Sequence, residues 1–466
     1  MMHKRNRGWS VARMLAVGAA ALSAASVCER AFAQAAPEST DYQDPASGGF
    51  VDSLATGAKF GTMVRFSNFM RSKPNDSGPT AEATGLGGWV FGESGEWRNM
   101  LSFGGALAYV AKLHGPDGHG GNFILKDPDQ EGYATLGVAY ARLRFEDHAL
   151  TAGRISPQYA WNLDNIYRFY NRYDGAFIGR RDVRAMIPLS YQGASVAGKV
   201  ANDTVRYYGG YVNKMKQVND TDFKQLAEAA FLPGESSGML YGGAQWKVNN
   251  NVMLQGAYNR ADNLLDMGWV DLDMVHRFDK DRYVRLDVQY IHQAANGSKN
   301  LGDFSMDNKA AYLEARWVPW WIPYGAFGWN SDGDELRSPF SLGPSYLVQR
   351  IGENAKAGEQ TIILGSTFDF STLGARGLAF DVSYGQRTDR HMKGNKEQPL
   401  ADWNEVATDL IYTLGQEFGW AKGMRMRARW AQVKESGNNF SGGTITDISR
   451  KQTDIRFDLQ WRVAFN

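Results

Sequence analysis

Arginine residues spaced two apart near the C-terminus are the first candidates for a functional role. Arg425, Arg427 and Arg429 alternate with the apolar and small residues of the segment 424–430. Because side chains of a strand point to opposite faces in turn, this spacing predicts one cationic and one apolar face. A guanidinium facing lipid near the bilayer midplane costs about 2 to 4 kcal/mol, so in a membrane strand the arginines must face water. Rows of fixed cations attract anionic groups, which predicts a pathway for such groups.

The same alternation assigns further charged residues to the water-filled side. The predicted basic ladder consists of Arg65, Arg206, Arg285, Arg316, Arg387, Arg425, Arg427, Arg429, Arg456 and Arg462. The carboxylates expected beside or opposite it are Asp271, Asp273, Asp287, Glu314, Asp381, Asp409, Asp454 and Asp458. An interior with both signs predicts a channel in which one wall attracts anions and another guides cations. The alternative is a salt-bridge lattice that only stiffens the wall, and we expect about half of these residues to do no more than that.

Two long links are candidates for narrowing such a channel. The link 156–185 is rich in Tyr and Arg, and a loop of this length either packs on itself or folds into the barrel. Infolding is the favoured interpretation, with the candidate constriction residues Arg180, Arg181, Asp182 and Arg184. The link 331–359 supplies a candidate acidic counterpart, formed by Asp332, Asp334 and Glu335.

Signals for metal binding or catalysis are weak. His114, Asp117 and His119 are conceivable metal ligands, but a solvated, glycine-rich loop tip explains them better. The sequence contains no GxSxG, HExxH or phosphate-loop motif. We therefore predict no metal, no cofactor and no enzymatic activity, while an embedded hydrolase stays open as an alternative because catalytic triads are spatial.

The elements that must position the charges are predicted to be strands. Between Asp454 and Phe465, apolar residues alternate with polar or small ones without a slip. Period-2 segments bounded by turn residues predict about eighteen strands, near residues 58–71, 84–92, 98–113, 133–145, 148–154, 187–199, 204–213, 238–248, 252–263, 268–278, 282–293, 309–318, 321–330, 360–370, 377–388, 404–413, 422–434 and 453–465.

The connections between these strands alternate between short and long. The long ones lie at 72–83, 114–132, 155–186, 214–237, 294–308, 331–359, 389–403 and 435–452. Outer-membrane barrels combine short periplasmic turns with long extracellular loops, whereas a soluble sandwich has no reason to do so. The predicted fold is therefore an all-β, transmembrane antiparallel β-barrel of about 18 strands.

Aromatic residues cluster beside the short turns and predict a girdle at the periplasmic membrane boundary. They are Phe145, Trp246, Phe278, Tyr283, Trp317, Trp320, Trp321, Tyr324, Phe370, Trp420 and Phe465. The alternative for each is an ordinary core aromatic. Segment 221–232 predicts a short capped helix within an outer loop.

The N-terminus predicts export through the inner membrane. A basic head precedes an apolar core at 14–27, and Ala31-Phe32-Ala33 is similar to a signal-peptidase site. We expect a signal peptide at 1–33, a periplasmic lead-in at 34–57 and the barrel at 58–466. The single cysteine, Cys28, lies in the predicted signal peptide, so the mature chain would have no thiol.

Composition supports a barrel and gives no sign of nucleic-acid binding. Removing residues 1–33 takes away five basic residues and one acidic residue, which leaves 46 basic against 49 acidic residues and a net charge of about −3. The mean hydropathy of −0.43 and the absence of a second long apolar run argue against a helical membrane protein. A β-barrel is compatible with this low mean hydropathy, since only every second residue of a barrel strand faces lipid.

Six segments of the chain carry a family resemblance, namely the runs 184–188, 191–199, 210–216 and 219–223, together with 49–53 and 150–154. They resemble the OprD-type family of specific porins. It implies an eighteen-stranded barrel with infolded loops and a basic ladder, which passes small solutes such as amino acids, short peptides or organic acids. The chain departs from the family in ending on Asn466 after Phe465 and in the spacing of its 155–183 loop.

We therefore expect a substrate-selective porin of the bacterial outer membrane. Its expected partners are membrane lipid and small solutes, and its expected state is a monomer or loose homotrimer. Two alternatives remain, namely an exporter of an acidic polysaccharide and an outer-membrane hydrolase.

Overall fold

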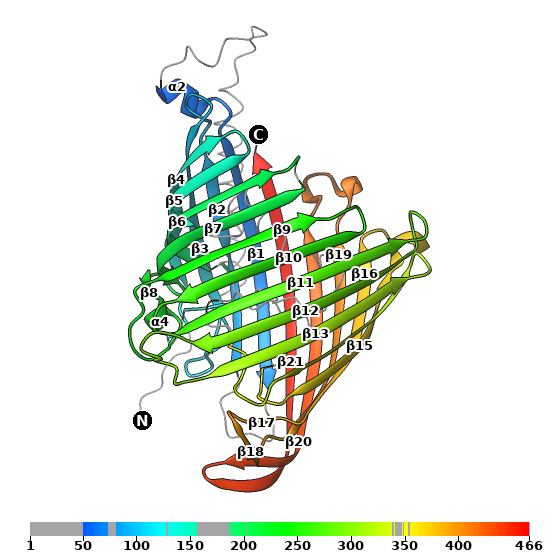
Figure 1. The fold of residues 1–466 in the computed structure, drawn as a ribbon. Helices are drawn as coiled ribbons and strands as arrows, with labels where there is room; N and C mark the ends of the chain where they lie inside the picture. The colour runs from blue at the N-terminus through cyan, green and yellow to red at the C-terminus, as the bar shows by residue number, and fades with distance from the viewer. Residues whose placement is uncertain are drawn as a thin grey trace, which may run out of the picture. The chain divides into compact units, whose positions relative to one another are not determined.

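Eighteen long antiparallel strands close into a barrel within the part of the chain that the structure describes (Figure 1). This computed structural model describes residues 50–72, 81–126, 129–155, 186–187, 189–202, 204–337, 340, 347, 349–352 and 355–465. These residues belong to the structural unit Gly49–Asn466. The predicted fold class is confirmed, and the predicted signal peptide lies outside the described residues.

The barrel strands follow one another in chain order around the wall. They are β1 (Lys59–Ser72), β2 (Ala81–Glu93), β3 (Leu101–His114), β4 (Tyr133–Phe145), β5 (His148–Ile155), β6 (Ser190–Val200), β7 (Val205–Lys216), β9 (Met239–Lys247), β10 (Val252–Ala261), β11 (Leu265–Arg277), β12 (Tyr283–Ala295), β13 (Ser305–Arg316), β14 (Trp321–Asn330), β15 (Gln360–Asp369), β16 (Leu378–Thr388), β19 (Asp402–Thr413), β20 (Arg425–Ser441) and β21 (Thr444–Phe465). The two-residue strand β8 (Lys224–Gln225) pairs with the end of β7, and β17 (His391–Met392) pairs with β18 (Asn395–Pro399).

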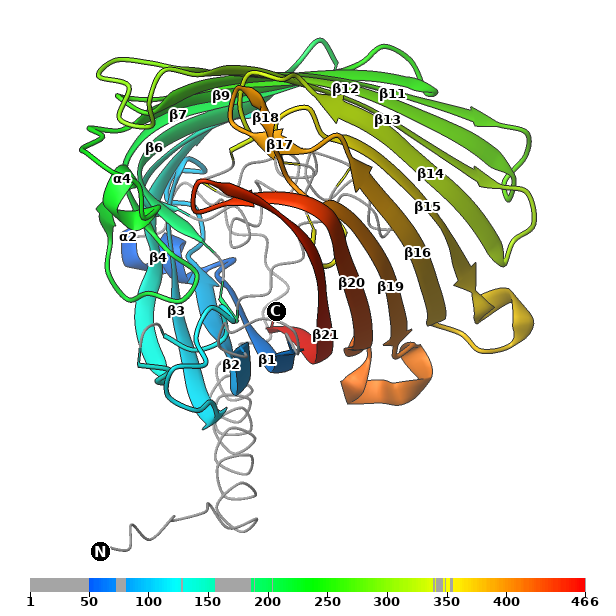
Figure 2. The same ribbon diagram turned by 90° about the horizontal axis from the view of Figure 1, so that it is seen from below.

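The first and last strands close the barrel. β1 pairs with β2 on one side and with β21 on the other, from Phe60 opposite Phe465 to Ser72 opposite Thr453. Figure 2 shows blue β1 between β2 and red β21. Because the sheet returns to its first strand, it leaves no unpaired edge along this seam.

Each strand has one apolar face outside and one polar face inside. On β21, Asp454, Arg456 and Asp458 are 3 to 5% exposed, whereas Ile455 and Phe457 are 41% and 39% exposed. This is the pattern that the alternation predicts for a wall between hydrocarbon and a polar interior. None of the helices in the described part of the chain is long and apolar enough to cross a membrane.

The predicted aromatic girdle lies mainly on the outer face. Trp246, Phe278, Trp317 and Trp420 are between 48% and 72% exposed. Tyr324 is different, because it lies on the inner face, is 6% exposed and donates a hydrogen bond to Asp381. Tyr283 likewise donates its hydroxyl proton inward, to Glu314. Strand parity, and not proximity to a turn, decides which side of the wall an aromatic residue faces.

Three segments differ from their sequence-based description. The link 435–452 is mostly a β-hairpin, because β20 and β21 stay paired up to Ser441 opposite Thr444. Gly442 and Gly443 form the two-residue turn with φ of 59° and 86°, values that glycine adopts without strain. Instead of a helix over 221–232, the structure has only the short helix α4 (Leu226–Ala229). Part of the predicted lead-in also forms a helix, α2 (Phe50–Ala55).

Helix α2 is attached to the adjacent short turn. The backbone N–H of Gly95, between β2 and β3, donates a hydrogen bond of 2.7 Å to the carbonyl of Leu54. The helix therefore continues directly into β1 at the end of the barrel that carries the short turns.

Gly88 provides a test of the close pairing between β1 and β2. Its φ is +144°, and a Cβ atom there would lie 1.8 Å from the carbonyl oxygen of Met63. We expect Gly88→Ala to destabilise the barrel by more than about 1 kcal/mol, because the strained backbone and the clash both oppose pairing. The yield of barrel that resists unfolding by dodecyl sulfate before heating measures this. Gly209→Ala, whose Cβ would come no closer than 3.4 Å to a neighbouring atom, is the control.

Candidate functional site

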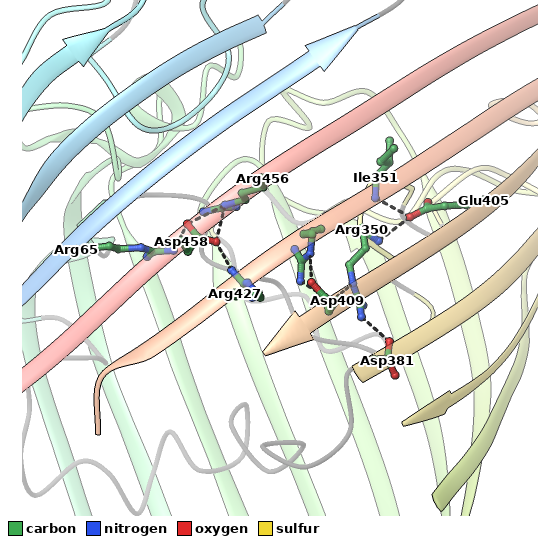
Figure 3. A network of polar contacts seen from close by, with 10 residues as sticks. Arg65, Arg350, Ile351, Asp381, Glu405, Asp409, Arg427, Arg456 and Asp458 are labelled. Carbon is green, nitrogen blue, oxygen red and sulfur yellow. Dashed lines mark hydrogen bonds and ion pairs between the residues drawn. The ribbon is translucent and has the colours of Figure 1, made fainter. Parts of the chain in front are cut away.

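Three arginines converge on Asp458 on the inner wall (Figure 3). Its carboxylate contacts Arg427 at 2.6 Å, Arg456 at 2.9 Å and Arg65 at 3.6 Å. The hydroxyl of Ser67 donates a further hydrogen bond of 2.6 Å to the same carboxylate. These residues come from β1, β20 and β21, so the cluster lies across the seam where the barrel closes.

A second cluster lies on the neighbouring strands β16, β19 and β20. Arg350, from the connection between β14 and β15, contacts Asp409 at 2.6 Å and Asp381 at 2.9 Å. Asp409 also accepts two hydrogen bonds from Arg429, at 2.7 and 3.1 Å. Arg350 is 6% exposed and both aspartates are fully buried, so this connection delivers a cation onto the inner wall.

The strand register explains why a residue from outside the wall is needed. Asp381 lies opposite Asp409, and on the next pair of strands Arg429 lies opposite Arg456. Like charges directly opposite each other destabilise a sheet. Arg350 bridges the two aspartates. On the other pair of strands, Asp458 contacts Arg456, one of the two facing arginines. Arg350 from the connection and Asp458 on β21 thus compensate the repulsion that the register creates.

The backbone around Arg350 is fixed by Glu405 on β19. One carboxylate oxygen of Glu405 accepts hydrogen bonds from the N–H groups of Arg350 and Ile351, at 2.7 and 2.9 Å. The other oxygen accepts from the N–H of Gly352 at 2.8 Å. Segment 349–352 is thus anchored to the inner wall by its backbone as well as by its side chain.

Towards the long-loop end, Arg387 and Arg390 surround Glu359. Arg387 contacts Glu359 at 3.5 Å and Glu405 at 3.8 Å, and it donates hydrogen bonds to the carbonyl oxygens of Leu347 and Gly352. Arg390 contacts Glu359 at 3.3 Å. Burial raises the pKa of Glu359, and the two arginines oppose that rise. The connection 331–359 is therefore attached to the wall at two places.

The opposite wall is mainly acidic. Asp273 and Asp287 lie opposite each other on β11 and β12, and Arg285 contacts them at 3.2 and 3.0 Å. Next to them, Asp271 accepts a hydrogen bond of 2.9 Å from Gln255. All three carboxylates are 0 to 1% exposed.

Four other members of the predicted ladder lie nearer the short-turn end. Arg316 donates to the carbonyl oxygen of Pro319 at 3.0 Å, and Arg462 lies over the ring of Phe91 at 5.6 Å. Arg206 and Arg425 are partly exposed on the inner face. The structure thus places all ten predicted ladder residues on the inner side of the strands, while their contact with a solute stays a prediction.

The two predicted constriction groups differ in what the structure describes. Arg180, Arg181, Asp182 and Arg184 lie outside the described residues. Asp332 contacts Lys396 and His391, Asp334 contacts Arg337 and Lys393, and Glu335 contacts Lys356. The hydrogen bonds from Lys396 and His391 lower the pKa of Asp332. These acidic residues hold loops to one another, and their role as an acidic counterpart in the channel stays a prediction.

Several charged residues of the wall were missed from the sequence. Glu405 shares the inward parity of Asp409, and Arg142 and Glu93 form a buried ion pair of 2.6 Å between β4 and β2. Alternation could have identified these three. Arg350 gives no such signal, because it lies in an irregular connection that has no period.

An antiparallel barrel with an apolar outer face and a charged inner wall defines a membrane-spanning channel of the outer-membrane type. A family model described as outer membrane porin, OprD family, matches residues 66–450. The chain belongs to the OprD family of outer membrane porins. Its short turns are therefore periplasmic and its long loops extracellular. No curated protein sequence matches the chain.

Solved structures share this fold at low sequence identity. OpdK of Pseudomonas aeruginosa, solved with vanillate, has a TM-score of 0.71 and 16% identity, and the match covers 88% of this chain and 100% of that chain. A BenF-like porin from Pseudomonas fluorescens Pf-5 has a TM-score of 0.72, 16% identity and coverage of 88% and 100%. OccAB1 of Acinetobacter baumannii has a TM-score of 0.73, 14% identity and coverage of 91% and 100%.

Proposed function

We propose that this porin admits small water-soluble solutes that carry a carboxylate, such as amino acids, short peptides or organic acids. The observation that carries the proposal is the excess of guanidinium groups on the inner wall of β1, β20 and β21. Arginine binds carboxylates with two parallel hydrogen bonds, so a row of arginines offers successive binding positions along the wall. Vanillate, present in the OpdK structure, is a small carboxylate and is compatible with this solute class.

The acidic wall of β11 and β12 supports a separation of charges across the lumen. A solute with both a carboxylate and an ammonium group has an oppositely charged partner on each wall. Passive diffusion requires that each interaction be weak enough to release the solute. The arrangement favours solute selection by charge placement.

The charge of the arginine row can be tested directly. We expect the triple replacement of Arg425, Arg427 and Arg429 by Gln to lower the preference for anions over cations, because three fixed positive charges leave the lumen. Reversal potentials in planar bilayers under a salt gradient measure this preference. Arg260→Gln is the control, since Arg260 is exposed on the outer face of β10. An unchanged reversal potential in the triple variant would contradict a pathway along this row.

The same recordings separate the proposed porin from its two alternatives. A porin shows steady openings that small carboxylates reduce, whereas an exporter of acidic polysaccharide is blocked far better by long anionic oligomers than by monomeric acids. An outer-membrane hydrolase would turn over lipid or peptide without conducting. The family assignment favours the porin.

Two further features stay proposals. We expect cleavage after Ala33, which Edman sequencing of the purified protein would show as a start at Gln34. We also expect a monomer or loose homotrimer, which mass measurement in mild detergent distinguishes.

A further inference from the structure

A hollow of about 630 Å³ lies on the outer face of the barrel at its periplasmic end. Its sides are two turns, one around the 3-10 helix η1 (Phe370–Leu373) and one around η2 (Gln416–Ala421). Ala375 and Phe418 line it from these turns. Figure 2 shows η2 as the orange coil between β19 and β20, at the same end of the barrel as the turn between β15 and β16.

The floor of the hollow is an apolar part of the outer wall. Leu410, Ala428 and Phe457 follow one another on β19, β20 and β21 in one register row. Leu410 is 46% and Phe457 39% exposed, so both project outward from the wall. Ala428 lies between them and has only a methyl group, so the wall is lower at this position and the hollow forms there.

The rim of the hollow carries one cation and one anion. Arg376 and Glu417 both line it, one from each turn. Neither of them forms an ion pair with another residue in the described parts of the chain. Both belong to periplasmic turns, where a membrane surface begins, and exposed Leu373 and Trp420 extend from the same two turns.

We propose that this hollow binds a membrane phospholipid with a zwitterionic phosphate and primary amine headgroup. An acyl chain lies over Ala428 between Leu410 and Phe457. Arg376 donates hydrogen bonds to the phosphate, and Glu417 accepts hydrogen bonds from the ammonium group. The opposite charges on the rim match a zwitterion better than a headgroup with a single negative charge. The inference rests on insertion in the outer membrane and not on which solute the lumen passes.

Native mass spectrometry of the delipidated protein in detergent tests this site with three probes. We titrate dioleoyl phosphatidylethanolamine, phosphatidylcholine and phosphatidylglycerol, which share acyl chains and a phosphate. Phosphatidylcholine lacks the N–H donors, so we expect it to bind about tenfold more weakly than phosphatidylethanolamine, as for the loss of one charge-assisted hydrogen bond. We expect phosphatidylglycerol, which has no amine, to be similarly weak.

The two rim residues have different expected signatures. Glu417→Gln should remove the preference for the ethanolamine lipid over the choline lipid. Arg376→Gln should weaken the binding of both by about tenfold, because it removes the partner of their common phosphate. Arg98→Gln is the matched control, since Arg98 lies at the periplasmic end and stacks on Trp97 away from the hollow.

Filling the hollow tests the acyl-chain position. Ala428→Leu should lower the affinity for all three lipids, whereas Ala244→Leu, an exposed alanine on the outer face of β9, should not. Unchanged ethanolamine-lipid binding in Arg376→Gln and Ala428→Leu would overturn the proposal, as would a preference that survives Glu417→Gln. A lipid-free dimer that Ala428→Leu abolishes would also overturn it, since a second copy would then cover the hollow. If Ala428→Leu does not fold, the two turn variants decide.

Discussion

Replacing Arg350 by Gln is expected to release segment 349–352 from the inner wall and to raise the single-channel conductance of the porin. Arg350 is the cation shared by Asp381 and Asp409, which are fully buried and lie opposite each other. Removing one partner of a buried ion pair leaves an uncompensated charge and costs about 3 to 5 kcal/mol. The repulsion between the two aspartates then also opposes closure of this part of the wall.

Two measurements check this expectation together. Urea unfolding in lipid vesicles should show the loss of free energy of unfolding, and planar-bilayer recordings should show larger conductance with weaker discrimination between solutes. Adding Asp381→Asn to the variant should recover part of the stability, because one of the two buried carboxylates becomes neutral, and a double-mutant cycle gives the coupling energy. Arg337→Gln is the control, since this arginine pairs with Asp334 in the same connection. Wild-type conductance in Arg350→Gln would show that segment 349–352 does not restrict the lumen.

The second large effect is expected for Asp458→Asn. Asp458 is the shared anion of Arg65, Arg427 and Arg456, all of which are less than one-fifth exposed. Without the carboxylate, three guanidinium groups remain close together, and we expect a loss of about 3 to 5 kcal/mol in stability. The lumen also gains net positive charge, so the preference for anions should increase.

The direction of the change in ion selectivity distinguishes Asp458→Asn from the triple arginine variant. Asp458→Asn should shift the reversal potential in the direction opposite to the triple arginine variant. Asp307→Asn is the matched control, because Asp307 is on the outer face of β13 and contacts His292 and Tyr290. If Asp458→Asn and Asp307→Asn give the same reversal potential, the Asp458 cluster does not lie along the ion path.

Most of the fold could be predicted from the alternation of apolar and polar residues along the sequence. The period of two predicts both the number of strands and the face of each residue, since hydrocarbon and water select opposite side chains on one strand. It succeeded on β21, where Asp454, Arg456 and Asp458 are buried and Ile455 and Phe457 are exposed. It failed over 435–452, because a hairpin with polar residues on both faces gives no apolar period.

The candidate site was only partly accessible from the sequence. Register could not be deduced, so the facing pairs Asp381–Asp409 and Arg429–Arg456 were not foreseen. Their compensation depends on Arg350, whose position follows from the three-dimensional course of a long connection. The acidic residues Asp332, Asp334 and Glu335 were chosen by charge alone, and the structure shows each of them paired with a basic residue of the loops.

The seam between β1 and β21 has a consequence for how the barrel assembles. The hydrogen bond from Ser67 to Asp458 joins residues that are 391 positions apart in the chain. Contacts between such distant residues form late and slowly, because a long stretch of chain must first be ordered. The barrel can therefore close only when the C-terminal strand β21 is in place, and the Asp458 cluster on the inner wall forms with that closure. A chain truncated before β21 would lose the Asp458 cluster together with the final strand. The edges of β1 and β20 that pair with β21 would then be open to pairing with other chains.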